Sequence, residues 1–175
     1  SGMSPEKVSI SENIIGGTLE SAFGFPRIGI RIANIEGVEI EDNEIQFSLS
    51  NTPGFHYTGV WIENCRGANV KSNRILNIDP PNQLYQLEDL LVGLRVDNSH
   101  GTCIEQNNLE ALGQGMRFSG NSIVYSLFRN TMSGFDQGVF LHSADIGLRQ
   151  GWYGGIIEND LDNNWIRSNG PTTDR

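Results

Sequence analysis

The chain has 175 residues, a formal net charge of −9 and only two lysines beside its ten arginines. This length suits one domain with a single continuous core, and the acidic balance excludes the basic stripe that a nucleic-acid phosphate backbone requires. No apolar run is long enough to span a membrane. We therefore expect neither nucleic acid nor a membrane as a partner.

Composition favours strands over helices. The chain holds 21 glycines and 18 asparagines against 6 prolines, and valine and isoleucine are frequent. Such residues are typical of short strands joined by tight turns, so we expect an all-β protein. The opening letters SGM look like the remnant of an expression tag. Residues 1–175 are expected to form one domain, excised from a larger multidomain protein.

An internal repeat runs along most of the chain. The pattern apolar-x-x-Asn-x-apolar occurs six times, as ISENII (10–15), IEDNEI (40–45), VKSNRI (70–75), IEQNNL (104–109), LFRNTM (127–132) and IIENDL (156–161). Its asparagines, 23 to 34 residues apart, are Asn13, Asn43, Asn73, Asn107, Asn130 and Asn159. A second pattern, Gly-apolar-x-apolar, precedes five copies as GIRI (29–32), GVWI (59–62), GLRV (93–96), GMRF (115–118) and GVFL (138–141). Three of these continue into Asn34, Asn64 and Asn98.

Short repeated units that cannot bury their own apolar face are the signature of a solenoid. The repeat, over residues 8 to 161, resembles the right-handed parallel β-helix repeat family with the pectate-lyase-like fold. That resemblance implies an all-β, right-handed, single-stranded parallel β-helix of about six coils. Val38, Ile40 and Ile45 would then point inward. Asn43 would mark a corner, where its amide bonds the turn backbone and the equivalent asparagines of adjacent coils.

Insertions fall mainly at one place in each repeat, just before the Gly-apolar-x-apolar strand. Three long ones, at 16–28, 46–58 and 76–92, should form a wall beside one sheet, where function concentrates. A further insertion is expected at 142–155. Past Leu161 the pattern stops, and the remaining residues are expected to cap the open end of the stack.

One line of outward-facing side chains stands out beside these loops. The x positions of the second pattern are Arg31, Trp61, Arg95, Arg117 and Phe140, and the next outward positions are Ala33, Glu63, Asp97, Ser119 and His142. Aromatic faces can pack on sugars while guanidinium and carboxylate groups bond hydroxyls. We predict an extended-polysaccharide site formed by Arg31, Trp61, Glu63, Arg95, Asp97, Arg117, Phe140 and His142, with loop contacts from Tyr57, Tyr85, Trp152 and Tyr153.

A structural interpretation of the same residues stays open. Arg95 could form an ordinary surface ion pair with Glu63 or Asp97, and Trp61 could pack under the 76–92 loop. The same two carboxylates are the only candidates on this line for a glycosidase pair. Neither a clustered-aspartate site nor a Gly-His-Gly motif is found, so no catalytic residue is expected.

The two cysteines, Cys65 and Cys103, lie 38 residues apart without a CxxC or Cys/His spacing. They do not fall in one column of adjacent coils, so both thiols are expected to be free. No metal site and no cofactor are predicted.

The repeats and the Arg/Trp line resemble the non-catalytic β-helix carbohydrate-binding modules attached to plant cell-wall glycoside hydrolases such as xylanases. This resemblance implies a secreted, extracellular protein of bacterial type that binds a β-linked plant polysaccharide, xylan first, beside a catalytic domain in the same parent chain. Two alternatives remain: a lyase, hydrolase or epimerase acting on uronate-containing glycans, and a structural or adhesive solenoid without a functional strip.

Overall fold

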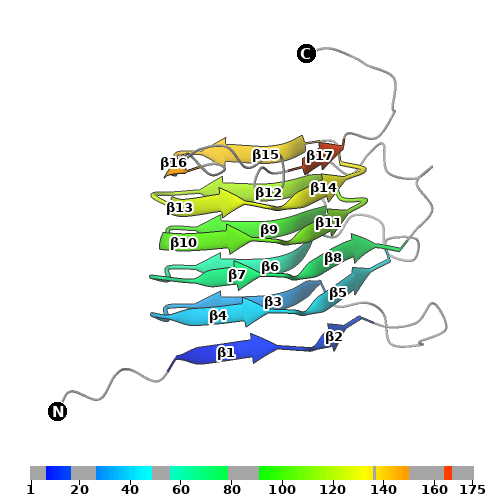
Figure 1. The fold of residues 1–175 in the computed structure, drawn as a ribbon, viewed down its shortest axis with the longest axis horizontal. Helices are drawn as coiled ribbons and strands as arrows, with labels where there is room; N and C mark the ends of the chain where they lie inside the picture. The colour runs from blue at the N-terminus through cyan, green and yellow to red at the C-terminus, as the bar shows by residue number, and fades with distance from the viewer. Residues whose placement is uncertain are drawn as a thin grey trace, which may run out of the picture.

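The computed structural model describes residues 7–16, 27–48, 56–78, 91–135, 137–149 and 164–166. Within these ranges the chain forms seventeen strands in three sheets, and no helix. All pairings between strands are parallel, and each strand pairs with the one three places further along the chain, as β1 pairs with β4. The chain is therefore a parallel β-helix, as the sequence predicts (Figure 1).

Each coil passes through the three sheets in the same order. Sheet A contains β1 (Val8–Ser11), β4 (Val38–Glu41), β7 (Asn69–Lys71), β10 (His100–Glu105), β13 (Ile123–Phe128) and β16 (Asp145–Arg149). Sheet B contains β2 (Ile14–Ile15), β5 (Glu44–Phe47), β8 (Arg74–Asn77), β11 (Asn108–Glu110), β14 (Thr131–Ser133) and β17 (Asn164–Ile166). Sheet C contains β3 (Ile28–Ala33), β6 (Tyr57–Glu63), β9 (Leu91–Asp97), β12 (Gln114–Ser119) and β15 (Gln137–His142).

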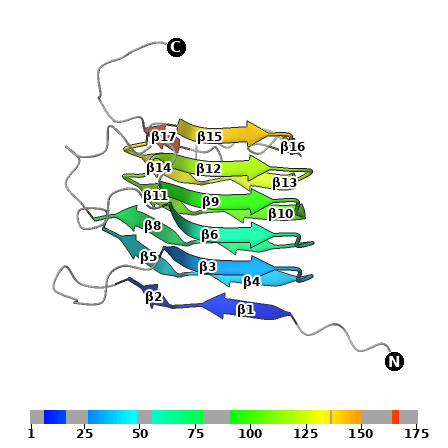
Figure 2. The same ribbon diagram turned by 180° about the vertical axis from the view of Figure 1, so that it is seen from behind.

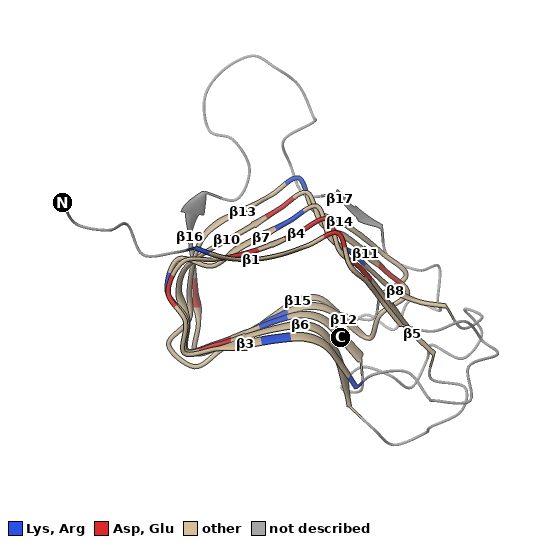
Figure 3. Ribbon diagram, turned by 90° about the horizontal axis from the view of Figure 1, so that it is seen from below, with Lys and Arg blue, Asp and Glu red and all other residues tan. Residues whose placement is uncertain are grey.

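Figure 2 shows the stack from behind, with the strands of sheet C lying one above another. Seen along the stack, sheets A and C face each other and sheet B joins them on one side (Figure 3). The apolar side chains of all three sheets meet between them, and Val38, Ile40 and Ile45 are fully buried. Their inward orientation is confirmed. The alternation of buried and partly exposed residues along these strands follows from the two-residue period of a strand.

The asparagine corner between sheets A and B is confirmed for five coils. The side chain of Asn43 donates to the carbonyl oxygens of Ile10 and Glu41 and to Oδ1 of Asn73, at 2.9 to 3.0 Å. Its own Oδ1 accepts from the backbone and side-chain nitrogens of Asn13. The same bonds recur upward, so that Asn13, Asn43, Asn73, Asn107 and Asn130 form one asparagine ladder. It satisfies turn groups that burial would otherwise leave unpaired.

The last coil differs from the prediction. Residues Asp145–Arg149, expected inside an insertion, form β16 and pair with β13. The strand that pairs with β14 begins at Asn164, five residues beyond Asn159, and Met132 lies opposite Trp165. The sixth copy of the pattern, IIENDL, therefore does not supply the strand that pairs with β14. Residues expected to cap the end, 164–166, continue sheet B instead; Asn159 itself lies outside the described residues.

The glycine of the second pattern has a steric cause. Gly59 faces the core, where an added Cβ would come within 2.5 Å of the Gly93 carbonyl oxygen and 2.6 Å of Ile75 Cγ2. Gly29, Gly93 and Gly115 meet equivalent backbone oxygens at 2.6 to 2.7 Å. Neighbouring coils approach so closely at this point that only a residue without a side chain fits.

Sheets C and A meet at a second polar corner, at the asparagines that follow the second sequence pattern. Asn34, Asn64 and Asn98 adopt the left-handed backbone conformation, with φ of 47° to 60°, which asparagine tolerates better than most residues. Beside this corner Cys65, Ser99 and Ser122 form a second hydrogen-bonded stack. Ser99 Oγ accepts from the backbone nitrogen of Cys65, and Ser122 Oγ accepts from that of Ser99.

Cys65 takes part in this stack in place of a serine. Its Sγ lies 3.3 Å from the carbonyl oxygen of Glu63 and 3.7 Å from that of Ile32, as a weak donor. Both cysteines are free, as predicted, with Cys65 buried and Cys103 partly exposed on β10.

Candidate functional site

The predicted line of side chains lies on the outer surface of sheet C. In the strand register Arg31 is opposite Trp61, Trp61 opposite Arg95, Arg95 opposite Arg117, and Arg117 opposite Phe140. The next outward column is Ala33, Glu63, Asp97, Ser119 and His142. Both columns are confirmed. We call the eight predicted ligand-binding residues among them the outer strip: Arg31, Trp61, Glu63, Arg95, Asp97, Arg117, Phe140 and His142.

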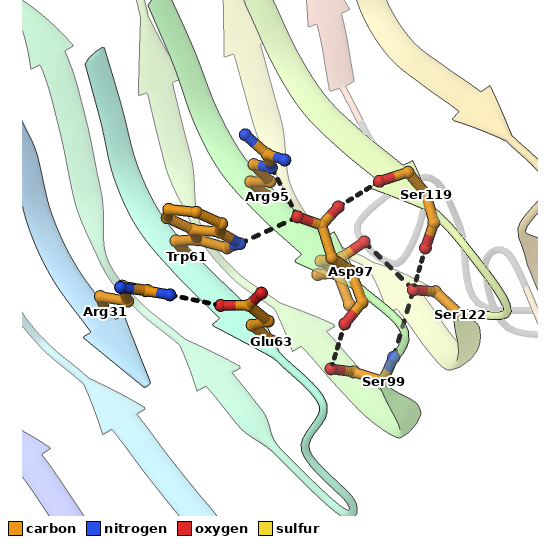
Figure 4. Close-up of polar contacts among 9 residues, drawn as sticks. Arg31, Trp61, Glu63, Arg95, Asp97, Ser99, Ser119 and Ser122 are labelled. Carbon is orange, nitrogen blue, oxygen red and sulfur yellow. Dashed lines mark hydrogen bonds and ion pairs between the residues drawn. The ribbon is translucent and has the colours of Figure 1, made fainter. Parts of the chain in front are cut away.

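Trp61 lies between two guanidinium groups. The Cζ atoms of Arg31 and Arg95 are each 4.4 Å from the centroid of the ring, and these two arginines come from the strands on either side of β6 (Figure 4). Each contact lies within the range of a cation–π interaction. Both faces of the indole are thus occupied by protein, so the expected packing of a sugar ring on a face of Trp61 has no room in this arrangement.

Asp97 fixes the geometry of this stack. Its Oδ2 accepts hydrogen bonds from Trp61 Nε1 at 2.9 Å and from Arg95 Nε at 2.7 Å, and its Oδ1 accepts from the hydroxyl of Ser119 (Figure 4). The residue is only 7% exposed. Three donors from three neighbouring strands thus converge on one buried carboxylate. Sequence reasoning placed Asp97 on the strip as a ligand, but in the structure it positions other side chains.

The remaining carboxylate of the strip pairs with the first arginine. Arg31 donates from one terminal nitrogen to Glu63 at 2.6 Å, and both side chains are partly exposed. The expected ion pair of Arg95 is made with Asp97, not with Glu63. The structural interpretation is therefore correct for the ion pair. Its other half, Trp61 packing under the 76–92 loop, falls mostly on residues outside the described ranges.

Arg117 differs from the other two arginines of the strip. Its guanidinium lies over the ring of Phe140, 5.3 Å from the centroid, and it forms no ion pair within the described part of the chain. Its Nε is buried without a hydrogen-bond acceptor. His142, in the next column, is exposed and lies opposite Ser119.

Of the four predicted loop contacts, the structure describes only Tyr57. Tyr57 lies on β6, is 2% exposed and packs edge-on against Phe47 at 5.8 Å between ring centroids. It belongs to the core, so the expectation that it contacts ligand is wrong. Its place at the start of a strand, two residues before an inward glycine, is the signal that could have shown this. Tyr85, Trp152 and Tyr153 lie outside the described residues.

Comparisons of the chain with protein-family models, curated proteins and solved structures find no match.

Other chemistry finds little support in the ranges that the structure covers. No group of three or more His, Cys, Asp or Glu side chains there is arranged to hold a metal ion, and none of its elements is a helix long and apolar enough to cross a membrane. The two carboxylates considered for glycoside hydrolysis, Glu63 and Asp97, are each bonded to an arginine of the strip. In glycoside hydrolysis one carboxylic acid protonates the leaving group and a second carboxylate acts as base or nucleophile, whereas both carboxylates here accept from arginines of the strip.

The outer surface of sheet B offers a comparison with the strip. Arg74 on β8 lies between Glu44 at 3.4 Å and Glu110 at 3.3 Å. The hydrogen bonds that Arg74 donates to Glu110 raise the pKa of Arg74 above its ordinary value, with a further contribution from Glu44. This arginine is neutralised on both sides and has no aromatic neighbour in the described residues, unlike the arginines of sheet C.

Proposed function

We propose that the chain is a non-catalytic carbohydrate-binding module that binds an extended plant cell-wall polysaccharide, of the xylan type, along the outer strip. The observation that carries this proposal is the Arg31–Trp61–Arg95 stack held by Asp97. It spans neighbouring strands about 4.8 Å apart, and the whole column from Arg31 to Phe140 covers four such steps, or about 19 Å. A few sugar units in a row have that length.

The stack supports binding because it holds hydrogen-bond donors rigidly. Arg95 uses its Nε for Asp97, and its two terminal nitrogens, which point away from that carboxylate in Figure 4, have no other partner among the described residues. A long side chain usually loses rotamer freedom when it binds. A guanidinium already fixed by an aromatic face and a carboxylate loses less, so its donors can bond sugar hydroxyls at a smaller entropic cost.

In this mechanism the role of Trp61 is to position its neighbours. The sugar contacts the arginine donors and the partly exposed Glu63 carboxylate, and the edge of the indole lines the surface between them. The pectate-lyase-like ancestry, the extracellular location and the catalytic domain in the parent chain belong to the same proposal, and they rest on the sequence resemblance alone.

The experiment is affinity gel electrophoresis and calorimetry of the protein with xylan, pectin and mixed-linkage glucan. Trp61→Ala should weaken binding by about 1 to 3 kcal/mol, the range for an anchoring aromatic residue, because both arginines lose the surface that holds them. Arg74→Ala, on sheet B, is the matched control and should bind as the unmodified protein does. Equal binding by the Trp61 variant would move the site off sheet C.

An assay for new reducing or unsaturated ends on the same polysaccharides tests the non-catalytic part of the proposal. Release of products that depends on Glu63 or Asp97 would replace it with an enzymatic function.

A further inference from the structure

Two arginines are direct neighbours on the outer strip. Arg95 on β9 and Arg117 on β12 are opposite each other in the parallel register, on strands about 4.8 Å apart. Each guanidinium stacks on an aromatic ring on the far side of the pair, Arg95 on Trp61 and Arg117 on Phe140. The two arginines therefore occupy adjacent positions of one column, between the positions of the two rings.

This arrangement is unfavourable for the protein alone. Like charges directly opposite each other on adjacent strands destabilise a sheet, and the chain as a whole carries a net charge of −9, so carboxylates are plentiful elsewhere. Nevertheless, none pairs with Arg117 in the described ranges, whereas Arg31 and Arg95 each have one. Unpaired charges that destabilise the free protein are expected at functional sites.

Charge along the strip is consequently uneven. At the β3 and β6 end, Arg31 is neutralised by Glu63; at the centre, Asp97 neutralises one positive charge and is saturated by Trp61, Arg95 and Ser119. From the centre to β15 one full positive charge, on Arg117, is not paired with any carboxylate of the described residues. The buried Nε of Arg117, which has no acceptor, adds to the mismatch.

We propose that Arg95 and Arg117 together form a subsite for an oxyanion carried by the polysaccharide, either the carboxylate of an acidic sugar or a sulfate ester. The inference rests on the proposed function and names the class of glycan that the strip selects. An oxyanion with two acceptor oxygens can bond the terminal nitrogens of both arginines at once. The oxyanion supplies a negative charge that no carboxylate of the described residues provides for Arg117. Both guanidinium groups are then attracted to the ligand between them.

The subsite makes a prediction that a structural role does not. Arg117→Gln removes a charge that no carboxylate of the described residues pairs with, and this gain offsets the lost contact with the Phe140 ring, so the melting temperature of the variant should stay unchanged or rise. A structural arginine would show the reverse. Arg74→Gln is the matched control, because Arg74 is also strand-borne and outward but already paired with two carboxylates.

Binding is measured by calorimetry at low salt with three tetrasaccharides that share a galactan-type ring: a galacturonate tetramer, its carboxyl-reduced neutral form, and a sulfated galactose tetramer. The unmodified protein should prefer one or both charged tetramers over the neutral one by about tenfold or more, as charge-assisted hydrogen bonds require. In Arg117→Gln that preference should fall to about twofold or less, while Arg74→Gln keeps it. Which charged tetramer is preferred identifies the source of the oxyanion.

Several results would overturn the subsite. Binding of all three tetramers with equal affinity would refute it while leaving the proposed function intact. A preference that survives in Arg117→Gln would place the anion elsewhere, and a lowered melting temperature of that variant would make Arg117 structural. Failure of every tetramer, and of the xylan, pectin and mixed-linkage glucan above, would instead refute the proposed function on which the subsite rests.

Discussion

Asn73→Ala removes the central residue of the asparagine ladder. Asn73 is 1% exposed, and its side-chain nitrogen donates to the carbonyl oxygens of Ile40 and Lys71 and to Oδ1 of Asn107, at 2.8 to 3.0 Å. Its Oδ1 accepts from the backbone and side-chain nitrogens of Asn43. The substitution therefore leaves buried polar groups of three coils without partners.

The expected loss of stability follows from these contacts. Each buried group left unsatisfied costs about 1 to 3 kcal/mol, and the turn can relax enough to satisfy some of them through water. We expect a total of about 2 to 5 kcal/mol, larger than a single hydrogen bond would suggest. For a chain of this size that corresponds to a fall in melting temperature of roughly 5 to 15 °C.

Circular dichroism during urea and thermal unfolding measures this loss. The matched control is Asn13→Ala at the exposed end of the same ladder, where the side chain bonds Ser11 and Asn43 but lies in the terminal coil. That change should cost under about 1 kcal/mol, as surface substitutions usually do. Equal effects at the two positions would show that burial of the ladder is not what stabilises the coils.

Substitutions at Gly59, Cys65 and Trp61 test other parts of the structure. Gly59→Ala should destabilise by about 1 to 3 kcal/mol because its Cβ would meet the Gly93 carbonyl oxygen at 2.5 Å, whereas Gly37→Ala, with no atom within 4 Å of its Cβ, reports in the same melts only the cost of a positive φ. Cys65→Ser should be tolerated, since a hydroxyl can replace the thiol in the Ser99 and Ser122 stack, while Cys65→Val should lower the free energy of unfolding by about 1 kcal/mol or more. Thiol titration should count one reactive cysteine, Cys103, in the native protein and two after unfolding. In urea titrations, Trp61→Ala should destabilise the protein by about 1 to 3 kcal/mol, because the cation–π contacts and the hydrogen bond to Asp97 are lost. Trp61→Phe should destabilise it by less. If neither substitution has an effect, the stack does not stabilise sheet C.

The sequence predicts the solenoid and both outward columns because these depend on local periodicity. Alternating apolar residues fix which side chains of a strand face the core, and the repeat fixes which coils lie next to each other. The positions of Ile40 and Asn43 follow from those two facts alone. The last coil departs from the prediction because the motif IIENDL fits the pattern, whereas the strand that pairs with β14 begins at Asn164, four residues later than the motif places it.

The contacts within the outer strip could not be predicted in the same way. Periodicity places Arg31, Trp61 and Arg95 in one column, but whether the ring faces solvent or lies between the guanidinium groups depends on side-chain rotamers. Those are set by Asp97, whose three donors lie as many as 36 residues from it in sequence. Such a network can be recognised only when the three-dimensional positions of side chains on neighbouring coils are known.

The most direct test of binding at the outer strip is an NMR titration of the indole N–H signals. The chain has three tryptophans, and the signal of Trp61 is identified by its absence from Trp61→Phe. With a glucuronoxylan oligosaccharide, which carries both a β-xylan backbone and a carboxylate, the Trp61 signal should shift and saturate with the binding isotherm, because its N–H bonds Asp97 beside the arginine donors. A Trp61 signal that stays in place while another indole signal shifts, or while calorimetry shows binding, would contradict the account.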